Sequence, residues 1–200
     1  LRGSRLSGND NSGALFSAAP RSTIYDNEFS SNAFEGLYLA ADTVQTLVSG
    51  NTAYTNVDAG FFIEDSSRTV VEYNTSYGNG FSGISAVNTQ ELSIAGNRVF
   101  ANASHGILLN NTSSSTLSAN EAFNQGSIGI YLANGSSSNT LVGNHSYANN
   151  YGMYLASGAL NVMAGGGGGY RRDGVAAADA TDSLAFNSPS FSSVARMSSG

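Results

Sequence analysis

Marker residues recur along most of this chain at a fixed step of about 23 residues. Asparagines are spaced 23 or 24 residues apart, and a glycine follows each of them after nine residues, or after eight in the last case. The asparagine column contains Asn27, Asn51, Asn74, Asn97, Asn120 and Asn144. The glycine column starts one period earlier and contains Gly13, Gly36, Gly60, Gly83, Gly106, Gly129 and Gly152. A regular period of this length is typical of proteins built from stacked repeats.

Apolar residues alternate with polar ones around these markers. Ile94 stands three residues before Asn97, and Ile107 and Leu109 follow Gly106 with one residue between them. The other repeats show the same arrangement, which is the period of two that a β-strand requires. Asn, Gly and Ser residues between the apolar positions are typical of turns. The pattern predicts an all-β fold, a right-handed parallel β-helix of about seven coils with three short strands per coil; right-handed winding is the rule for parallel crossovers.

Stacking at roughly 4.8 Å per coil places like residues above one another, so the asparagines should form an inward amide ladder. A second ladder is expected at Asn9, Asn32, Asn56, Asn79, Asn102 and Asn149, with Asn124 one residue early in the sixth coil. A third polar column is expected at Asp65, Asn88, Asn111 and Asn134. Three polar corners and three strands predict a triangular cross-section.

Residues 139–157 (NTLVGNHSYANNYGMYLAS) and 49–67 (SGNTAYTNVDAGFFIEDSS) resemble the repeats of right-handed parallel β-helix proteins. That pectin-lyase-like superfamily includes pectin lyases, mannuronan C5-epimerases and NosD-type periplasmic proteins. The resemblance covers residues 1–164 and implies an extracellular or periplasmic location. It also implies a function among proteins that cleave, epimerise or bind polysaccharides, but a shared fold does not choose among these activities.

The repeat defines the predicted domain boundaries. Residues 1–164 form the β-helix, and the five consecutive glycines at 165–169 predict a flexible hinge. Residues 170–200 carry no repeat and are expected to be a disordered tail, a cap or an arm that docks elsewhere.

Composition excludes several classes of function. The net charge of −6 argues against nucleic acid, which requires a basic surface, and against a groove tuned to polyanions. Cysteine is absent, which excludes disulfides and thiolate metal sites. The sequence contains no membrane-spanning run.

Candidate catalytic residues are Arg98, Glu121 and His145, which follow the ladder asparagines on three successive coils. A uronate lyase or epimerase requires Ca²⁺ or arginine together with a base. The DPHE motif of the mannuronan epimerases is missing, so no catalytic residue transfers from that family. An exposed salt-bridged stack is the favoured alternative for this column. Whether the protein is an enzyme therefore stays open, with a lyase or C5-epimerase activity as the expectation if it is one.

Metal binding is weakly indicated. Glu64 and Asp65 are adjacent carboxylates that would suit Ca²⁺, but the next coil supplies no matching pair. We therefore predict neither a metal site nor a cofactor.

The clearest candidate for ligand binding is a column that alternation places on the outside of the third strand. It contains Tyr38, Phe62, Tyr131 and Tyr154, and shares its register with Leu15, Ser85 and Leu108. A continuous apolar patch of this kind is expected to meet the tail, another protomer or a ligand. Aromatic rings also stack on sugar faces. A further aromatic column, Tyr54, Tyr77, Phe100, Phe123 and Tyr147, is expected to be buried core.

Two functions follow. In the first, the chain is the rod of a secreted carbohydrate-active or carbohydrate-binding protein that contacts polysaccharide along the aromatic column, with any catalytic coils outside this segment. In the second, it is a structural or adhesive module that self-assembles through this column and through its uncapped ends, because open solenoid ends expose unpaired strand edges.

Overall fold

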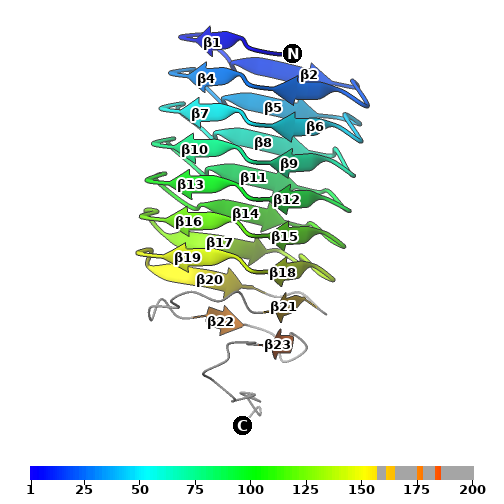
Figure 1. The fold of residues 1–200 in the computed structure, drawn as a ribbon, viewed down its shortest axis with the longest axis vertical. Coiled ribbons are helices and arrows are strands. Elements are labelled where there is room, and N and C mark those ends of the chain that lie inside the picture. The colour runs from blue at the N-terminus through cyan, green and yellow to red at the C-terminus, as the bar shows by residue number, and fades with distance from the viewer. Residues whose placement is uncertain (157–160, 165–174, 178–182, 186–200) are drawn as a thin grey trace.

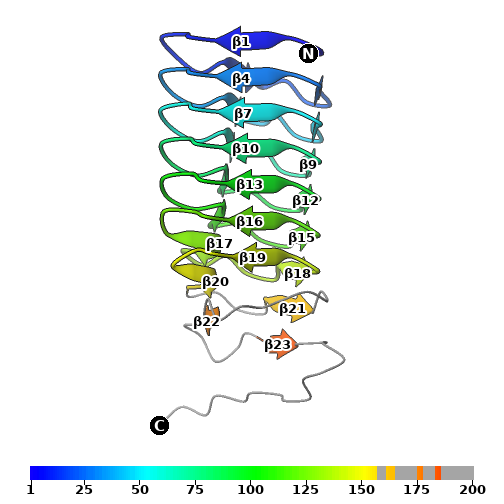
Figure 2. The same cartoon turned by 60° about the vertical axis from the view of Figure 1, so that its left-hand side comes forward.

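The computed structural model describes residues 1–156, 161–164, 175–177 and 183–185. In these ranges every regular element is a β-strand, and the chain winds into a right-handed parallel β-helix (Figure 1). Its coils stack along one axis from the N-terminal end, as both views show (Figure 2). The predicted fold class, period and arrangement of three strands per coil are confirmed.

The strands form three parallel sheets, each named here by its first strand. The β1 sheet contains β1 (Arg5–Ser7), β4 (Glu28–Ser30), β7 (Thr52–Tyr54), β10 (Thr75–Tyr77), β13 (Arg98–Phe100), β16 (Glu121–Phe123) and β19 (His145–Tyr147). The β2 sheet contains β2 (Ala14–Ser17), β5 (Leu37–Ala40), β8 (Phe61–Glu64), β11 (Ile84–Val87), β14 (Ile107–Asn110), β17 (Ile128–Ala133), β20 (Tyr151–Leu155) and β22 (Val175–Ala177). The β3 sheet contains β3 (Thr23–Tyr25), β6 (Leu47–Ser49), β9 (Val70–Glu72), β12 (Ser93–Ala95), β15 (Thr116–Ser118), β18 (Thr140–Val142), β21 (Val162–Ala164) and β23 (Ser183–Ala185).

The core is built from the apolar columns that the sequence predicts. Ile94 on β12 and Ile107 and Leu109 on β14 are fully buried, and each pairs with the equivalent residue of the next coil. Within a strand, buried and partly exposed positions alternate, as in β8. Like residues therefore stack on like, and each side chain of the core packs against the coils before and after it.

Asn97 shows how the first amide ladder is built. Its Oδ1 accepts hydrogen bonds from the backbone N and Nδ2 of Asn74 at 2.9 and 3.0 Å. Its Nδ2 donates to Oδ1 of Asn120 at 2.9 Å and to the carbonyl of Val71 at 2.8 Å. Buried amides must be paired in this way, so the predicted ladder is confirmed and fixes the stacking register.

The second ladder differs from the prediction at one coil. Gln125, not Asn124, occupies the inward position between Asn102 and Asn149. Asn124 is exposed and adopts a left-handed conformation with φ 53°. Gln125 was missed because its longer amide did not match the asparagine pattern.

A left-handed residue precedes the ladder position throughout the coils. Asp26 and Tyr73, with φ 56° and 53°, stand directly before the ladder residues Asn27 and Asn74. The predicted third column has the same role, since Asp65 has φ 49° and the following Ser66 is the buried residue. The third column is therefore a series of turn residues rather than an inward ladder. Left-handed backbone reverses the chain sharply, which turns the next side chain inward.

The glycine column is required by close approach between coils. A Cβ on Gly106 would lie 2.4 Å from the carbonyl oxygen of Gly129, and a Cβ on Gly83 would lie 2.9 Å from that of Gly106. These contacts are to backbone, which cannot move aside. Only glycine fits at these positions.

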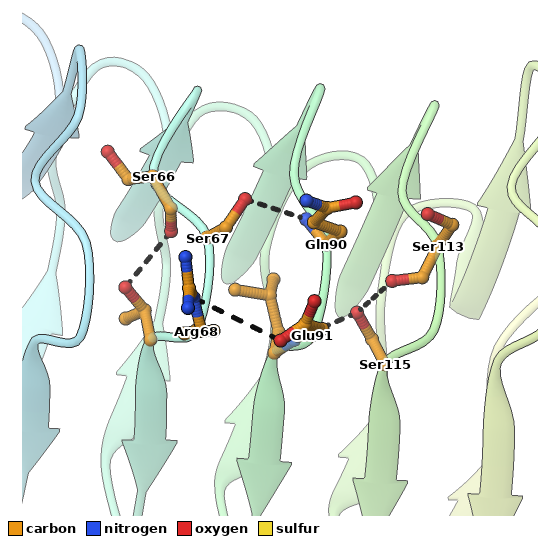
Figure 3. A network of polar contacts seen from close by, with 9 residues as sticks. Ser66, Ser67, Arg68, Gln90, Glu91, Ser113 and Ser115 are labelled. Carbon is orange, nitrogen blue, oxygen red and sulfur yellow. Dashed lines mark hydrogen bonds and ion pairs between the residues drawn. The ribbon is translucent and has the colours of Figure 1, made fainter.

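Hydroxyl groups and ion pairs hold the corner between the β2 and β3 sheets (Figure 3). The backbone N of Gln90 donates to Oγ of Ser67 at 3.2 Å, and Arg68 lies 4.0 Å from Glu91. Each contact links one coil to the next. The corners therefore repeat the coil-to-coil pairing of the sheets.

The part of the chain described after residue 164 consists of two strands. β22 pairs in parallel with β20, and β23 pairs with β21. The predicted glycine hinge at 165–169 lies outside the described residues, as does the rest of the predicted tail at 170–200. The domain boundaries therefore stay a prediction.

Candidate functional site

The predicted ligand-binding residues lie on the outer face of the β2 sheet. Tyr38, Phe62, Tyr131 and Tyr154 come from β5, β8, β17 and β20, and each is partly exposed between two buried neighbours. Pairing of equivalent residues in adjacent strands keeps them in one column along the rod. We call this column, from Leu15 to Tyr154, the aromatic strip.

The structure brings the four rings together as two pairs. The rings of Tyr38 and Phe62 have centroids 5.0 Å apart and an interplanar angle of 43°. Those of Tyr131 and Tyr154 are 5.4 Å apart at 67°. Ser85 lies between the pairs and is only 1% exposed. The strip is therefore two aromatic surfaces separated by a short, buried interval.

His105 borders this interval, although its sequence gave no reason to place it there. Its ring lies 5.0 Å from that of Tyr131 and 6.4 Å from that of Phe81. Burial lowers the pKa of His105, so its imidazole is neutral at pH 7. No motif in the sequence indicated this position for His105.

Unpaired polar atoms gather at the same place. Among the described residues, the buried side-chain nitrogen and oxygen atoms without a hydrogen-bond partner are Oγ1 of Thr46, Oγ of Ser82 and Ser85, and Nδ1 of His105. The last three come from neighbouring coils beside the strip. Buried polar groups are normally paired, so these three atoms have unused hydrogen-bonding capacity.

An acidic group adjoins the other end of the strip. The hydroxyl of Tyr38 donates a short hydrogen bond to Oε2 of Glu64. Burial raises the pKa of Tyr38 to about 12, with Glu64 and the nearby charges of Glu35 and Asp65 adding to the shift. Glu64, one of the two adjacent carboxylates considered for Ca²⁺, therefore already has a partner.

The catalytic candidates lie on a different sheet. Arg98, Glu121 and His145 start the consecutive strands β13, β16 and β19. Nε of Arg98 lies 3.0 Å from Oε2 of Glu121, and both side chains are exposed to solvent in part. The His145 ring lies against that of Tyr147, 4.6 Å between centroids. The structure thus joins Arg98 and Glu121 as an ion pair, away from the aromatic strip.

The second aromatic column corrects the expectation that it is core. It points outward from the β1 sheet, because the middle residue of each strand faces the core, as Ala53 does in β7; Phe123, in the outer position of β16, is itself buried at 8% exposed. Its rings are stacked nearly parallel, with centroids 4.9–5.1 Å apart and interplanar angles of 2–10°. The guanidinium of Arg98 covers the rings of Phe100 and Phe123. We call this column the ring stack.

Two negative findings concern the described residues alone. In them, no group of three or more His, Asp or Glu side chains could hold a metal ion. No helix in the same ranges is long and apolar enough to cross a membrane.

The family model for the periplasmic copper-binding protein NosD matches residues 44–164. The chain belongs to the NosD family. A comparison with curated protein sequences gave no match.

Among solved structures, this NosD-family chain is similar to a mutant of the periplasmic alginate epimerase AlgG, with 20% identity and a TM-score of 0.81 over 88% of this chain and 47% of the other. It is also similar to the Dettilon tailspike protein, with 16% identity and a TM-score of 0.78 over 88% and 42% of the two chains. The A-module of Azotobacter vinelandii mannuronan C-5 epimerase AlgE4 gives 15% identity and a TM-score of 0.57 over 84% and 56%. The chain thus spans about half the length of these structures, and the likeness shows the fold.

Proposed function

We propose that this chain is the polysaccharide-binding rod of a carbohydrate-related protein that works outside the cytoplasm. The aromatic strip of the β2 sheet would contact the polysaccharide. The solved structures that resemble it include epimerases whose names specify alginate or mannuronan, and both the NosD family and AlgG carry the word periplasmic in their names. These names support the proposal by analogy.

The observation that carries the proposal is the tilt of the rings in the strip. A sugar packs against the face of an aromatic ring, so the face must be free. In the ring stack, interplanar angles of 2–10° mean that neighbouring rings cover one another's faces. In the strip, angles of 43° and 67° leave part of each face uncovered by its partner. The two columns contain similar residues, and only the strip has the geometry of a platform.

Polar atoms beside the strip fit the same role. Ser85 and His105 offer a hydroxyl and a neutral imidazole nitrogen without partners in the protein. Sugar hydroxyls can both donate and accept, so they can pair with either group.

Copper binding, which the family's name describes, does not fit the described residues. Copper sites use His, Met and Cys donors. The chain has no cysteine, and its two histidines lie on different sides of the rod, His105 beside Tyr131 and His145 on the β1 sheet. Met153 and Met163 are buried in the core. We therefore assign no copper site and derive no step through one.

The test is the double substitution Tyr131→Ala with Tyr154→Ala. We expect it to abolish retention on insoluble or anionic polysaccharide and to leave the circular dichroism spectrum unchanged, because both side chains point outward. Val57→Ala, which shortens an exposed apolar residue elsewhere, is the control and should bind normally. Retention equal to that of the unaltered protein would contradict the proposal.

A second candidate is self-assembly through the strip. The observation that favours it is Leu15, which continues the strip toward the first coil and is 60% exposed. In that case the same double variant would change the sedimentation coefficient of the protein. Neither the unaltered protein nor the variant would bind polysaccharide.

A further inference from the structure

An open groove of about 630 Å³ lies on the first coils, at the corner between the β3 and β1 sheets. Arg5, Glu28 and Tyr54 contribute side chains to its lining, and Gly3 and Gly50 contribute bare backbone. A Cβ on Gly3 would meet no described atom within 4 Å. The glycines therefore leave the groove open beside a set of polar groups.

These polar groups form a connected set. Nη2 of Arg5 lies 2.9 Å from Oε2 of Glu28, and the hydroxyl of Tyr54 donates to Oε1 of Glu28 at 2.6 Å. The hydrogen bond from Tyr54 is the main cause of a lowered pKa at Glu28, so this carboxylate is charged at pH 7. Arg5 remains 73% exposed and can turn to a ligand without leaving a buried site.

The same set recurs 93 residues later along the chain. Arg98 lies 3.0 Å from Glu121, and the hydroxyl of Tyr147 donates to Oε1 of Glu121 at 2.8 Å. This hydrogen bond raises the pKa of Tyr147. Each of the three residues is separated from its counterpart by the same 93 residues, which corresponds to four coils.

The glycines recur with the same spacing. Gly96 and Gly143 correspond to Gly3 and Gly50, and all four have positive φ between 57° and 66°. A Cβ on Gly143 would meet no described atom within 4 Å, and the same holds for Gly3. Beside Gly96 lies the ring of Tyr73, whose atoms would come within 2.8 Å of a Cβ. We call the two sets, each an arginine, a glutamate and a tyrosine with two glycines, the first and second notch; the groove of about 630 Å³ belongs to the first.

The intervening coils do not continue the charged groups. Thr52 and Thr75 occupy the positions between Glu28 and Arg98 on the β1 sheet. The notches are therefore two separate polar sites, about 19 Å apart at the usual spacing of strands.

We infer that the two notches are sugar-binding sites that together hold one linear, uncharged polysaccharide along the rod. Paired arginine and carboxylate groups present a donor and acceptors side by side, which suits the adjacent hydroxyls of a sugar. The charges within each pair cancel, and Asp26 adds a negative charge at the first notch, so neither notch offers net attraction to a uronate. A linear polymer supplies the same unit at both sites. This inference goes beyond the proposed function, because it concerns another face of the rod and a different class of glycan.

The test uses soluble neutral glycans, namely hydroxyethyl cellulose, glucomannan and amylose, in affinity electrophoresis. At least one is expected to retard the unaltered protein. Glu28→Gln or Glu121→Gln should weaken binding of that glycan by roughly a hundredfold, because loss of one site removes the gain of bivalent attachment. The double variant should not bind. Glu91→Gln, at the exposed pair with Arg68, is the matched control and should bind normally.

Three outcomes would overturn the inference. The first is that none of the three glycans binds, and the second is that the single variants bind as tightly as the control while melting at the same temperature. The third is that Tyr131→Ala with Tyr154→Ala abolishes neutral-glycan binding and the notch variants do not. That last result would leave the proposed function of the strip standing and reject the notches. Conversely, notch variants that lose neutral glycans but keep anionic polysaccharide separate the two sites.

Discussion

Gln125 stands in an asparagine position next to Asn102, and its Oε1 accepts the backbone N and Nδ2 of Asn102 at 3.1 and 3.2 Å. Its own Nε2 donates to the carbonyl of Val99 at 2.9 Å. The longer side chain thus accepts the two hydrogen bonds that an asparagine accepts elsewhere in the ladder, and donates to a backbone carbonyl as Asn97 does. The ladder depends on the position of the amide group and tolerates one extra methylene.

Replacing Gln125 by Leu should lower the free energy of unfolding by roughly 1–3 kcal/mol, because the backbone N–H of Asn102 and one of its two Nδ2 hydrogens would lose their acceptor; the other Nδ2 hydrogen bond, to the carbonyl of Ser76, would remain. Urea unfolding measures the difference. Gln90→Leu is the control, since Gln90 is exposed and bonds to Ser67 through its backbone. Equal losses for the two variants would mean that Gln125 is not part of a buried ladder.

Gly106→Ala should destabilise the protein by at least about 1–3 kcal/mol, the usual effect of overpacking, because the new Cβ would meet a backbone carbonyl at 2.4 Å. Gly8→Ala is the comparison: it has positive φ and free space, and should lose only roughly 1 kcal/mol to backbone strain. Ala101 and Ala148 already occupy equivalent left-handed positions. Thermal melting of both variants measures the two losses of stability. A larger loss for Gly8→Ala than for Gly106→Ala would contradict the prediction.

Phe100→Ala should remove two stacked pairs, with Tyr77 and with Phe123, at a cost of roughly 1–3 kcal/mol beyond the loss of buried area. The change tests whether the ring stack stabilises the register of the coils. Phe34→Ala, at an exposed corner, should cost much less in the same urea titration. If the ring stack does not stabilise the fold, Phe100→Ala and Phe34→Ala should lower the free energy of unfolding by the same amount.

Alkaline titration should find Tyr38 ionising near pH 12. Because this folded-state pKa lies above the ordinary value of 10, the contribution of Tyr38 to stability is complete below pH 10 and is lost as the pH rises toward 12. Glu64→Gln removes one charge and should lower the pKa of Tyr38 only in part, since burial is the larger cause. Ultraviolet difference spectroscopy follows the phenolate, with Tyr38→Phe identifying its signal.

The fold could be predicted because its rules are periodic. The columns that contain Asn97, Gly106 and Ile107 repeat with little variation. Equivalent side chains in successive coils therefore point the same way, either into the core or out to solvent. The error at the second ladder arose where a left-handed turn residue, and not alternation, sets the direction of the side chain. Asn124 has the residue type of the ladder, but it is the turn residue that precedes the inward Gln125.

The candidate sites were harder to predict, because they depend on the angles between side chains. The sequence placed Tyr131 and Tyr154 outside but could not give the tilt of their rings. The sequence identified Arg98 and Glu121 as neighbours. It did not indicate that Tyr147, which stands two residues after His145 on the next coil, would donate a hydrogen bond to Glu121. The sequence also gave no indication that His105 would reach the strip. The direction of a corner side chain follows neither the coil period nor the two-residue alternation of a strand.

The hydrogen bonds of the amide ladders run in one direction along the rod, which restricts how two rods can meet end to end. In the two buried ladders, each side-chain amide bond between described residues runs from the nitrogen of one residue to the oxygen of its counterpart nearer the C-terminus, from Asn27 to Asn51 and from Asn79 to Asn102 alike. The amide dipoles therefore point the same way and reinforce one another along the axis. A second rod could continue these rows only head to tail, because the opposite orientation would bring oxygen against oxygen or nitrogen against nitrogen. Any filament built through the ends of this β-helix would be polar, with two ends that grow by different chemistry.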